Sequence, residues 1–538
     1  MNVAPAAPLP EPGDPAVGSP RRVFAIVVGS GLSGLGVAIA LKKEGIDDLV
    51  ILERGDAVGG TWRDNVYPGC ACDIPSHLYS YSFELNPRWS KTYAPQPEIR
   101  AYVEHCTDKY DLRRHVRTGS EVTACTFDEA AGEWTVDVVT RPVDGPPVRV
   151  RYVGTVLVLA LGGLSKPSIA NIPGKERFAG PSFHSAEWRT DVDLGGKRIG
   201  VIGTGASAIQ FVPKIAPLAS HLTLFQRTPP WVLPRRERDF TEKEKRAFER
   251  VPGLMRAYRS SLYALHEATL AAFIGDPRLF RPVESAARSH LSSSIADKAL
   301  RAKLTPTYTM GCKRILTSND YYPALARPNV SVETTAIQAI DEAGVATADG
   351  VHHACDVLIY GTGFAVHDYL GGLPVKGLSG VDIHAAWTRG AEAYLGTSVA
   401  GFPNCFALLG PNVALGHNSI IVMIEAQVKH ILDVVRELRR TGAKWIEVRE
   451  SVMRRFNDAL HRRFAGSVWA TGCASWYLDE HGKNTTIWPA TTAEFWMRTR
   501  RFQPADYRLS SEVGVRQARD ASDSAPQTPH DGTTGASA

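Results

Sequence analysis

The sequence has little excess charge of either sign. It contains 61 Lys and Arg residues against 56 Asp and Glu residues, a net charge of +5 over 538 residues. Nucleic-acid binding needs a concentrated basic surface, which this balance does not provide. We therefore expect a small-molecule partner and no nucleic acid. Hydrophobic residues make up 44% of the chain, enough to build the cores of two or three domains.

Closely spaced cysteines are also lacking. The nearest two, Cys70 and Cys72, form a C-x-C pair and not the C-x-x-C of a dithiol redox site or a zinc knuckle. The sequence therefore predicts no metal site. In a cytoplasmic protein we expect reduced thiols, here at all eight positions: Cys70, Cys72, Cys106, Cys125, Cys312, Cys355, Cys405 and Cys473.

Long apolar runs are missing as well. No window approaches eighteen uninterrupted apolar residues, which predicts that no segment spans a membrane. Arg21 and Arg22 precede an apolar stretch and could begin a twin-arginine export signal. That stretch has no A-x-A cleavage site and carries three glycines at nucleotide-binding spacing. We reject the export signal and expect a cytoplasmic protein.

Two segments share one plan of apolar strand, glycine turn, helix and second apolar strand, beginning at Val23 and at Arg198. This repeat predicts an α/β protein with two Rossmann-like dinucleotide-binding domains and a charged helical insertion. The apolar runs Val153 to Leu161 and Asp356 to Tyr360 are interpreted as crossings between the domains. The predicted parts are a disordered tail (1–20), a first domain (21–152 and 357–508), a second domain (153–236 and 304–356), the helical insertion (237–303) and a disordered tail (509–538).

The first glycine turn is Gly29, Gly31 and Gly34, placed between a strand and a helix. Backbone N–H groups at such a helix start can hold a pyrophosphate. Glu53 closes the next strand, 24 positions after Gly29, where an acid is expected to bind ribose hydroxyls. A carboxylate there favours an unphosphorylated ribose, so we assign FAD to the first domain.

The second turn contains Gly203 and Gly205, and the position 24 residues after Gly203 is Arg227. A guanidinium suits a ribose 2′-phosphate, which predicts NADPH in the second domain. A surface arginine at a strand end is the plainer alternative. At the start of the second helix and beside Arg227, further contacts to this nucleotide are predicted from Thr204, Ser207, Gln210 and Thr228.

Two nucleotides on one chain place a flavin beside a hydride donor. This arrangement is shared by flavin disulfide reductases, oxidases and monooxygenases. The reductases need a reactive C-x-x-C beside the flavin, which this chain lacks. Oxidases and monooxygenases therefore remain.

Two further motifs lie at Gly60 to Asp73 and at Phe178 to Trp188. With them the chain resembles the class B flavoprotein monooxygenases, and within them the type I Baeyer-Villiger monooxygenases. The stretch from Phe178 to Trp188 matches the F-x-G-x-x-x-H-x-x-x-W signature of that family. Arg189 departs from it, because the family generally has Pro or Asp at that position. The resemblance covers about Val23 to Phe502, and a second signature is matched by Gly60, Trp62, Tyr67, Pro68, Gly69 and Asp73.

The resemblance implies an enzyme that converts ketones to esters or lactones with NADPH and O2 through a flavin peroxide, with sulfoxidation as a side activity. It implies that Arg314 stabilises the negative charge of the reaction and that Asp73 orients it. By the same resemblance, Lys313 is expected to join Arg227 at the 2′-phosphate, and His184 to couple domain movement to cofactor binding. Trp476 is expected to contact the nicotinamide, and Gly60, Thr61 and Trp62 to line the flavin site.

Two other interpretations stay open from the sequence. An N- or S-hydroxylating flavin monooxygenase would share both glycine turns, although Asp73 and the Lys313-Arg314 pair favour attack on ketones. An NADPH oxidase that only makes hydrogen peroxide, or an inactive nucleotide sensor, would share them too. The sequence does not indicate the oligomeric state or the particular ketone.

Overall fold

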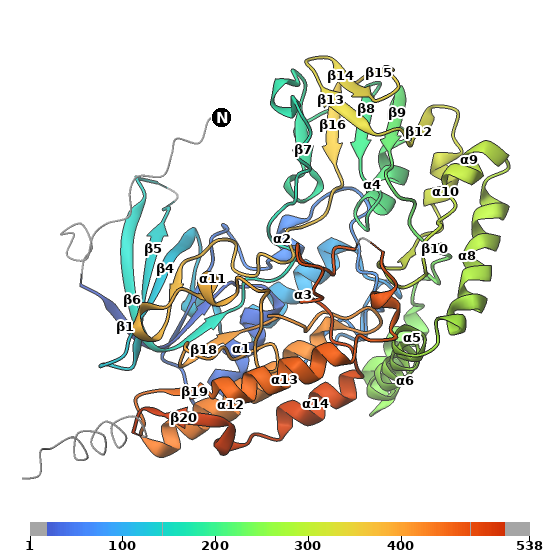
Figure 1. Ribbon diagram of the computed structural model, residues 1–538. Coiled ribbons are helices and arrows are strands. Elements are labelled where there is room, and N and C mark those ends of the chain that lie inside the picture. Colours follow the sequence, from blue (N-terminus) through green and yellow to red (C-terminus); the bar gives the residue numbers. More distant parts are fainter. Residues whose placement is uncertain (1–18, 143, 474, 512–538) are drawn as a thin grey trace, which may run out of the picture.

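The computed structural model describes residues 19–142, 144–473 and 475–511, and these form two lobes around two sheets (Figure 1). The predicted disordered tails fall almost entirely outside the described residues. In the larger sheet the strand order is β17-β4-β5-β6-β1-β2-β3, with β18 beside β6. Its strands are β1 (Arg21–Val28), β2 (Leu49–Leu52), β3 (Val116–Arg117), β4 (Ser120–Asp128), β5 (Glu133–Thr140), β6 (Val148–Leu159), β17 (Val375–Lys376) and β18 (Cys405–Ala407).

The second sheet is parallel throughout, in the order β12-β9-β8-β16-β7, and forms the upper lobe of Figure 1. Its strands are β7 (Ser182–His184), β8 (Arg198–Ile202), β9 (His221–Phe225), β12 (Val330–Glu333) and β16 (Val357–Tyr360). The described residues also form three small sheets: β13 (Ile337–Ile340) with β14 (Gly344–Thr347) and β15 (His352–Ala354), β10 (Val232–Leu233) with β11 (Leu316–Thr317), and, at the bottom of the lower lobe in Figure 1, β19 (Ile446–Val448) with β20 (Tyr507–Leu509).

Helices cover both sheets and fill the segment predicted to be a helical insertion, which lies along the right of Figure 1. The longest is α12, which begins at the N-cap Ser419, ends at Gly442 in a left-handed conformation, and packs against α1 and α14. The helices are α1 (Leu32–Lys43), α2 (Thr61–Asp64), α3 (Gln96–Lys109), α4 (Ala208–Ile215), α5 (Glu242–Arg250), α6 (Leu254–Ala268), α7 (Leu270–Ile274), α8 (Arg281–Ser294), α9 (Lys298–Lys303), α10 (Tyr321–Leu325), α11 (Ile383–Ala386), α12 (Ile420–Thr441), α13 (Glu450–Arg462) and α14 (Thr492–Arg500).

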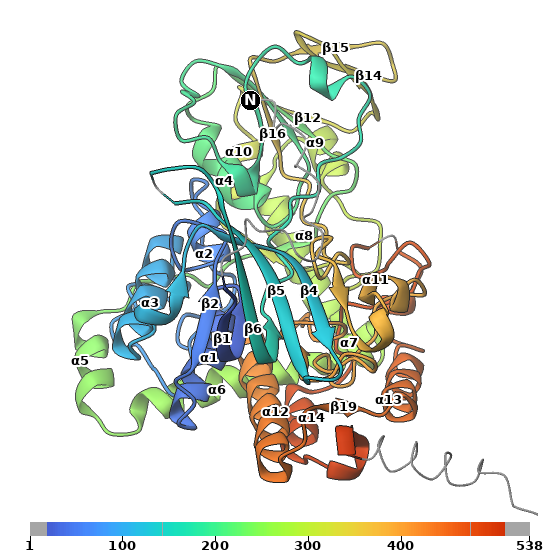
Figure 2. The same ribbon diagram turned by 90° about the vertical axis from the view of Figure 1, so that its left-hand side faces the viewer.

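Two of the predicted domain boundaries fall within a strand or at its start. The boundary at 153 falls inside β6, which pairs with β1 along its length, up to the partners Val28 and Leu159. The boundary at 357 falls at the start of β16, which lies between β8 and β7 of the second sheet. A strand that is hydrogen-bonded on both sides belongs to that sheet. The chain therefore leaves the first sheet after Leu159 and leaves the second after Tyr360, as Figure 2 lets the reader follow.

The segment that contains Arg21 and Arg22 is strand β1 of the central sheet, with Ala25 to Val28 buried. Over the part of the chain that the structure describes, every helix is too short or too polar to cross a membrane. Within the same residues, no group of three or more His, Cys, Asp or Glu side chains is arranged to hold a metal ion.

Candidate active site

The first glycine turn lies between β1 and α1 and can be built only from glycine. Gly29 has φ +103°, and a Cβ added there would lie 2.5 Å from the carbonyl oxygen of Ala160. Gly60, with φ +52°, faces this turn from the next loop, and its Cβ would lie 3.1 Å from Cα of Gly31. A Cβ on Gly34 would overlap the carbonyl oxygen of Gly29. The turn is thus a narrow, bare cradle in which backbone can approach a pyrophosphate.

Glu53 ends β2 beside this cradle and is 4% exposed. Its carboxylate accepts hydrogen bonds from the backbone N–H and the hydroxyl of Ser30, from the N–H of Gly55, and from Nη1 of Arg63 at 2.7 Å. Burial alone would raise the pKa of Glu53, but the charge of Arg63 and these hydrogen bonds lower it. The acid is therefore ionised and rigidly held.

Sequence reasoning missed Arg63, which neutralises Glu53. It follows Thr61 and Trp62 in α2, so a basic residue directly after the Gly60 motif was an available signal. Trp62 is 7% exposed and donates from Nε1 to the hydroxyl of Tyr79 at 3.1 Å. The α2 turn is therefore a packed support for the cradle as well as part of its lining.

The second glycine turn repeats the geometry of the first. Gly203 has φ +108°, and its Cβ would lie 2.5 Å from the carbonyl oxygen of Gly361. Thr204 donates from its hydroxyl to the carbonyl of Thr228 at 3.1 Å, which fixes the turn against the end of β9. Ser207 is the N-cap of α4, with no hydrogen bond from its side chain to the helix. This is a second place where a helix start meets a bare turn.

Gln210 was predicted to contact the pyrophosphate, and in the structure its amide forms hydrogen bonds with the first lobe. Its Oε1 accepts from the hydroxyl of Tyr67 at 3.0 Å and from the N–H of Ala71, and its Nε2 donates to the carbonyl of Ala71. The side chain therefore bridges α4 of the second lobe to the loop that carries Asp73. Its partners are more than a hundred residues away in the sequence, so local spacing could not reveal this role.

Arg227 and Lys313, predicted to bind the 2′-phosphate, carry two positive charges that act on one another. Arg227 is exposed, two residues after β9. Lys313 lies 4.9 Å above the ring of Tyr308. Burial and the charge of Arg227 lower the pKa of Lys313. Two positive charges that act on one another suit an anion with more than one charge, and the contact of this pair with the 2′-phosphate stays a prediction.

Asp73 and Arg314 form an ion pair, as the sequence predicted. Nε and Nη2 of Arg314 both donate to Oδ2 of Asp73, at 2.9 and 2.5 Å, and each side chain is about a third exposed. The charge of Asp73 raises the pKa of Arg314 above its ordinary value. Burial opposes ionisation of Asp73, but Arg314 and Arg235 hold its pKa below the usual range. Both groups are charged at neutral pH.

Comparison with known proteins assigns the chain to a family. The model of the "Flavin-binding monooxygenase-like" family matches residues 21–242. A Baeyer-Villiger monooxygenase of Pseudomonas aeruginosa is 44% identical over 499 residues, covering 92% of this chain and 93% of the relative. Another from Streptomyces coelicolor is also 44% identical, covering 93% and 95%. The chain belongs to the Baeyer-Villiger monooxygenase family.

Solved structures agree with that assignment and with the fold. Cyclohexanone monooxygenase from Rhodococcus sp. Phi1 bound to NADP+ is 28% identical with a TM-score of 0.79, covering 91% of this chain and 99% of that one. OTEMO in complex with FAD and NADP is 26% identical with a TM-score of 0.80, covering 90% and 99%. The predicted family and the predicted fold class, two Rossmann-like domains in an α/β chain, are confirmed.

His184 of the monooxygenase lies where the two lobes are joined. It ends β7, pairs with Tyr360 at the end of β16, and is fully buried. Its Nδ1 accepts from the N–H of Ala186 at 3.1 Å, and its ring lies 5.7 Å from that of Phe364. Burial lowers its pKa. Because Phe364 begins the return to the first lobe, His184 contacts the connection whose movement it was predicted to couple.

The thiol prediction is wrong for two of the eight cysteines. Cys312 and Cys473 form a disulfide, while the other six are free and buried. The bonded pair is separated by 161 residues. Spacing patterns report cysteines that are close in sequence, so only the fold could bring this pair together. Trp476, three residues after Cys473, is 40% exposed, and its ring lies 4.4 Å from that of Tyr477.

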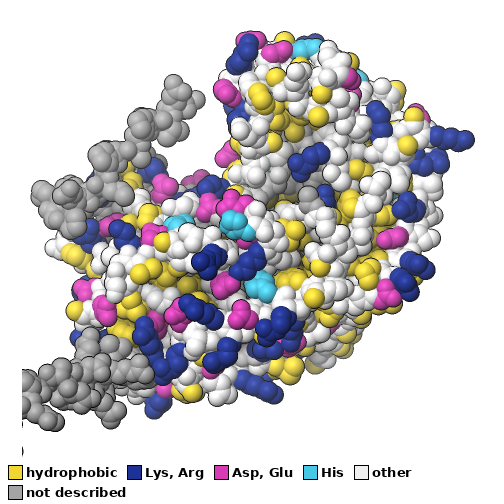
Figure 3. Space-filling view, viewed as in Figure 1, with side chains coloured by type: hydrophobic (Ala, Val, Ile, Leu, Met, Phe, Trp, Pro, Cys, Tyr) yellow, Lys and Arg dark blue, Asp and Glu magenta, His cyan; other side chains and the backbone are white. Residues whose placement is uncertain are grey.

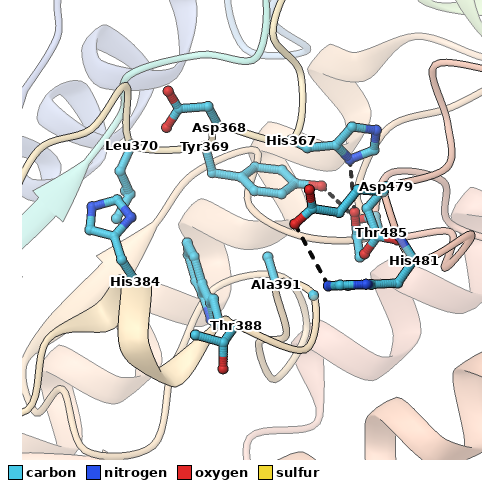
Figure 4. Close-up of a pocket in the computed structure, with 13 residues that line it drawn as sticks. His367, Asp368, Tyr369, Leu370, His384, Thr388, Ala391, Asp479, His481 and Thr485 are labelled. Carbon is cyan, nitrogen blue, oxygen red and sulfur yellow. Dashed lines mark hydrogen bonds and ion pairs between the residues drawn. The ribbon is translucent and has the colours of Figure 1, made fainter.

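A separate cavity of about 390 Å³ lies away from the glycine turns (Figure 4). It is lined by residues of three segments, within 367–370, 384–391 and 479–485, and includes none of the predicted site residues. Tyr369 and His367 point toward Thr485 across it and bond to its carbonyl and its hydroxyl. These bonds brace the C-terminal segment, and the cavity adds nothing to the active-site assignment.

Proposed function

We propose that this enzyme uses NADPH and O2 to insert one oxygen atom beside the carbonyl group of a ketone, giving an ester or a lactone. The observation that carries the proposal is the Asp73–Arg314 ion pair, joined to a chain that holds two glycine cradles. The face shown in Figure 3 is hollowed between the upper lobe and the lower body. We also propose that the enzyme is cytoplasmic, where the cell supplies NADPH.

The residues present fit both cofactors. FAD would lie at the first turn, where Gly29, Gly31 and Gly60 leave no side chain in the path of the pyrophosphate. Glu53 is ionised there and suits ribose hydroxyls. NADPH would lie at the second turn, with Arg227 and Lys313 at the 2′-phosphate, and Thr204, Ser207 and Thr228 around the pyrophosphate.

FAD, once reduced by NADPH, supplies the activated oxygen, and the protein controls the charge that develops. Attack on a carbonyl carbon makes a negative oxygen, which a fixed cation stabilises. Arg314 keeps its charge at every working pH. Asp73 engages Nε and Nη2, which fixes the guanidinium plane, and leaves Nη1 outside that contact. The pair therefore offers an oriented donor with a permanent positive charge.

Oxidation of an amine or a sulfide has a different electrostatic requirement. Transfer to a soft nucleophile needs a proton on the oxygen that is delivered, and Arg314 cannot supply one because it stays protonated. The ion pair therefore favours the ketone reaction over N- or S-hydroxylation. It also favours a productive enzyme over an NADPH oxidase, which needs no oriented cation.

The test is the Arg314→Ala variant, compared with Arg189→Ala. Arg189 is exposed and forms an ion pair with Asp191, two residues further along the chain. Its loss should therefore leave activity unchanged. We expect Arg314→Ala to retain FAD and to lose ester formation by about 100- to 1000-fold. The measurement is ester or lactone product from a panel of cyclic and aromatic ketones, with NADPH consumption followed in parallel.

Each result of that panel has a defined meaning. Full ester formation by Arg314→Ala would remove the role of the ion pair. Wild-type enzyme that oxidises amines and sulfides but no ketone would establish the hydroxylating alternative. Wild-type enzyme that converts all its NADPH to hydrogen peroxide, whatever substrate is added, would establish the oxidase.

A further inference from the structure

The disulfide joins the segment of Lys313 and Arg314 to the segment of Trp476. Cys312 directly precedes Lys313 and Arg314, and Cys473 precedes Trp476 by three residues. The bond is therefore a covalent link between the cationic side of the site and the segment predicted to cover the nicotinamide. None of the motifs that define the two nucleotide sites requires such a link.

The two ends of the bond have different surroundings. Cys312 is 1% exposed and follows Met310, which is fully buried, and Gly311, where a Cβ would lie 2.9 Å from the ring of Phe280. This end is enclosed by a packed core. Cys473 is half-buried and follows Thr471 and Gly472, which are exposed. The bond thus attaches a surface turn to a segment that is packed in the core.

Two hydrogen bonds among the described residues of the surface turn are local. The hydroxyl of Thr471 donates to the carbonyl of Val468, and the N–H of Tyr477 donates to the hydroxyl of Ser475. Bonds over two or three residues set the shape of a turn but do not set its distance from another segment. Tyr477, next to Trp476, is 1% exposed and packs in the core, and the disulfide adds a covalent link across 161 residues to the neighbour of Lys313.

We propose that the Cys312–Cys473 disulfide is a redox-controlled positioning link. It holds the surface turn, which carries Cys473 and Trp476, near Arg314, and reduction of the bond releases the turn. The inference rests on the proposed function for the role of Trp476. The closed turn limits access of water and retains the nicotinamide nucleotide. Disulfides of cytoplasmic proteins are usually transient or redox-sensing, which fits a link that is made and broken.

The chemistry needs a dithiol as reductant and balances as follows. A thiolate of the dithiol attacks Sγ of Cys473, the half-exposed sulfur, and the bond to Cys312 breaks. The Cys312 sulfur leaves with the electron pair and takes up a proton. The second thiolate of the dithiol then displaces Cys473, so the dithiol ends as a disulfide and the protein gains two thiols. The reverse exchange with a small disulfide restores the link.

The first experiment maps the bond in the purified FAD-containing enzyme. Free thiols are alkylated without reductant, and the peptides are then identified by mass spectrometry. We expect a cross-linked pair of peptides that contain Cys312 and Cys473, with the other six cysteines free. Alkylation of both Cys312 and Cys473 before reduction would overturn the proposal.

The second experiment compares the enzyme before and after reduction with dithiothreitol. We expect reduction to speed limited proteolysis between residues 471 and 476 by about tenfold or more, because the tether no longer restricts local opening. We also expect weaker NADP+ binding, followed by the flavin absorbance change. The same proteolysis rate and NADP+ affinity in both forms would contradict the proposal. Neither readout requires a ketone, so failure here is distinct from failure of the proposed reaction.

Variants give an independent check. Cys473→Ser should behave like the reduced enzyme and lose its response to dithiothreitol, and it alters the half-exposed end of the bond, where a serine is tolerated. Cys355→Ala is the matched control, since Cys355 is free, buried and placed in the second sheet region away from the link. It should keep the wild-type response. A Cys473→Ser enzyme with wild-type proteolysis and NADP+ affinity would overturn the link.

Discussion

The two glycine turns have nearly the same backbone but differ in the residue that follows them by 24 positions. Gly29 and Gly203 have φ values of +103° and +108°, and each approaches a carbonyl oxygen so closely that a Cβ would lie 2.5 Å from it. At the first turn the following residue is Glu53, buried and bonded to Arg63. At the second it is Arg227, exposed and near Lys313.

The difference between these two residues distinguishes a site for a permanently bound cofactor from a site for a cofactor that exchanges. A buried acid with four donors is organised before the nucleotide arrives, and the surrounding core would have to open to release what it binds. Exposed cations attract a phosphate from solvent and let it leave again. The same turn can therefore serve as a permanent flavin site or as a site for a co-substrate that is replaced in each cycle.

The largest expected effect comes from alanine in place of the first glycine of each turn. Either alanine must adopt a positive φ and meet a backbone oxygen, at a cost of a few kcal/mol. We expect Gly29→Ala to yield protein without FAD or no folded protein. Gly203→Ala should stay yellow with FAD and lose NADPH affinity. Absorbance at the flavin band and NADPH titration measure the two outcomes; loss of FAD from both variants would erase the distinction.

Arg227→Ala sharpens the comparison on the exposed side. Loss of a charge-assisted contact to the 2′-phosphate should raise KM for NADPH by about 10- to 100-fold, since such a contact contributes about 1.5–3 kcal/mol. KM for NADH, which has no 2′-phosphate, should change little. Steady-state rates with both nucleotides give the ratio. An equal rise of KM for NADH and NADPH would show that Arg227 only supports the strand end.

Acid should weaken the lower lobe of the molecule through buried histidines. His430, on α12 behind α1, is 1% exposed, and burial lowers its pKa to about 4; the pKa of His77 is lowered to about 4 in the same way. Between pH 6.5 and 4 the unfolded chain binds these protons and the folded chain does not. Stability is therefore fully present above pH 6.5 and falls as the pH drops, by about 2 kcal/mol per histidine at pH 5.

The measurement is thermal unfolding and FAD release at pH 7.5 and pH 5. His430→Gln has no proton to gain, so its stability should fall less between the two pH values than that of the wild type. His221→Gln, on the half-buried end of β9 in the second sheet, is the control and should keep the wild-type difference. If His430→Gln loses as much stability between pH 7.5 and pH 5 as the wild type, His430 is not the cause of the acid effect.

Local motifs in the sequence were sufficient to predict the two turns and the family. The glycines, Glu53 and Arg227 stand at short fixed offsets, so their positions relative to a strand and a helix follow from the chain alone. Asp73 and Arg314 were paired through resemblance, and the structure shows the hydrogen bonds between them. Their catalytic role, and those of His184 and Trp476, stay predictions for the experiments above.

Interactions between distant segments could not be predicted in this way. The amide of Gln210, whose contact with the nucleotide stays a prediction, bridges to Tyr67 and Ala71. The sheet to which β6 and β16 each belong follows only from their hydrogen-bond partners, because the buried ends of both strands are apolar without alternation. Local sequence signals carry no information about such partners.

The sequence by itself determined that this chain has two dinucleotide turns, which nucleotide suits each, and which family it belongs to, because these depend on glycine backbone freedom and on side-chain charge at fixed spacing. Only the tertiary structure decided that Arg63 neutralises Glu53, that Gln210 joins the lobes, and that Cys312 is bonded to Cys473. Those facts depend on which distant segments pack together to bury apolar surface, and no short stretch of sequence contains them.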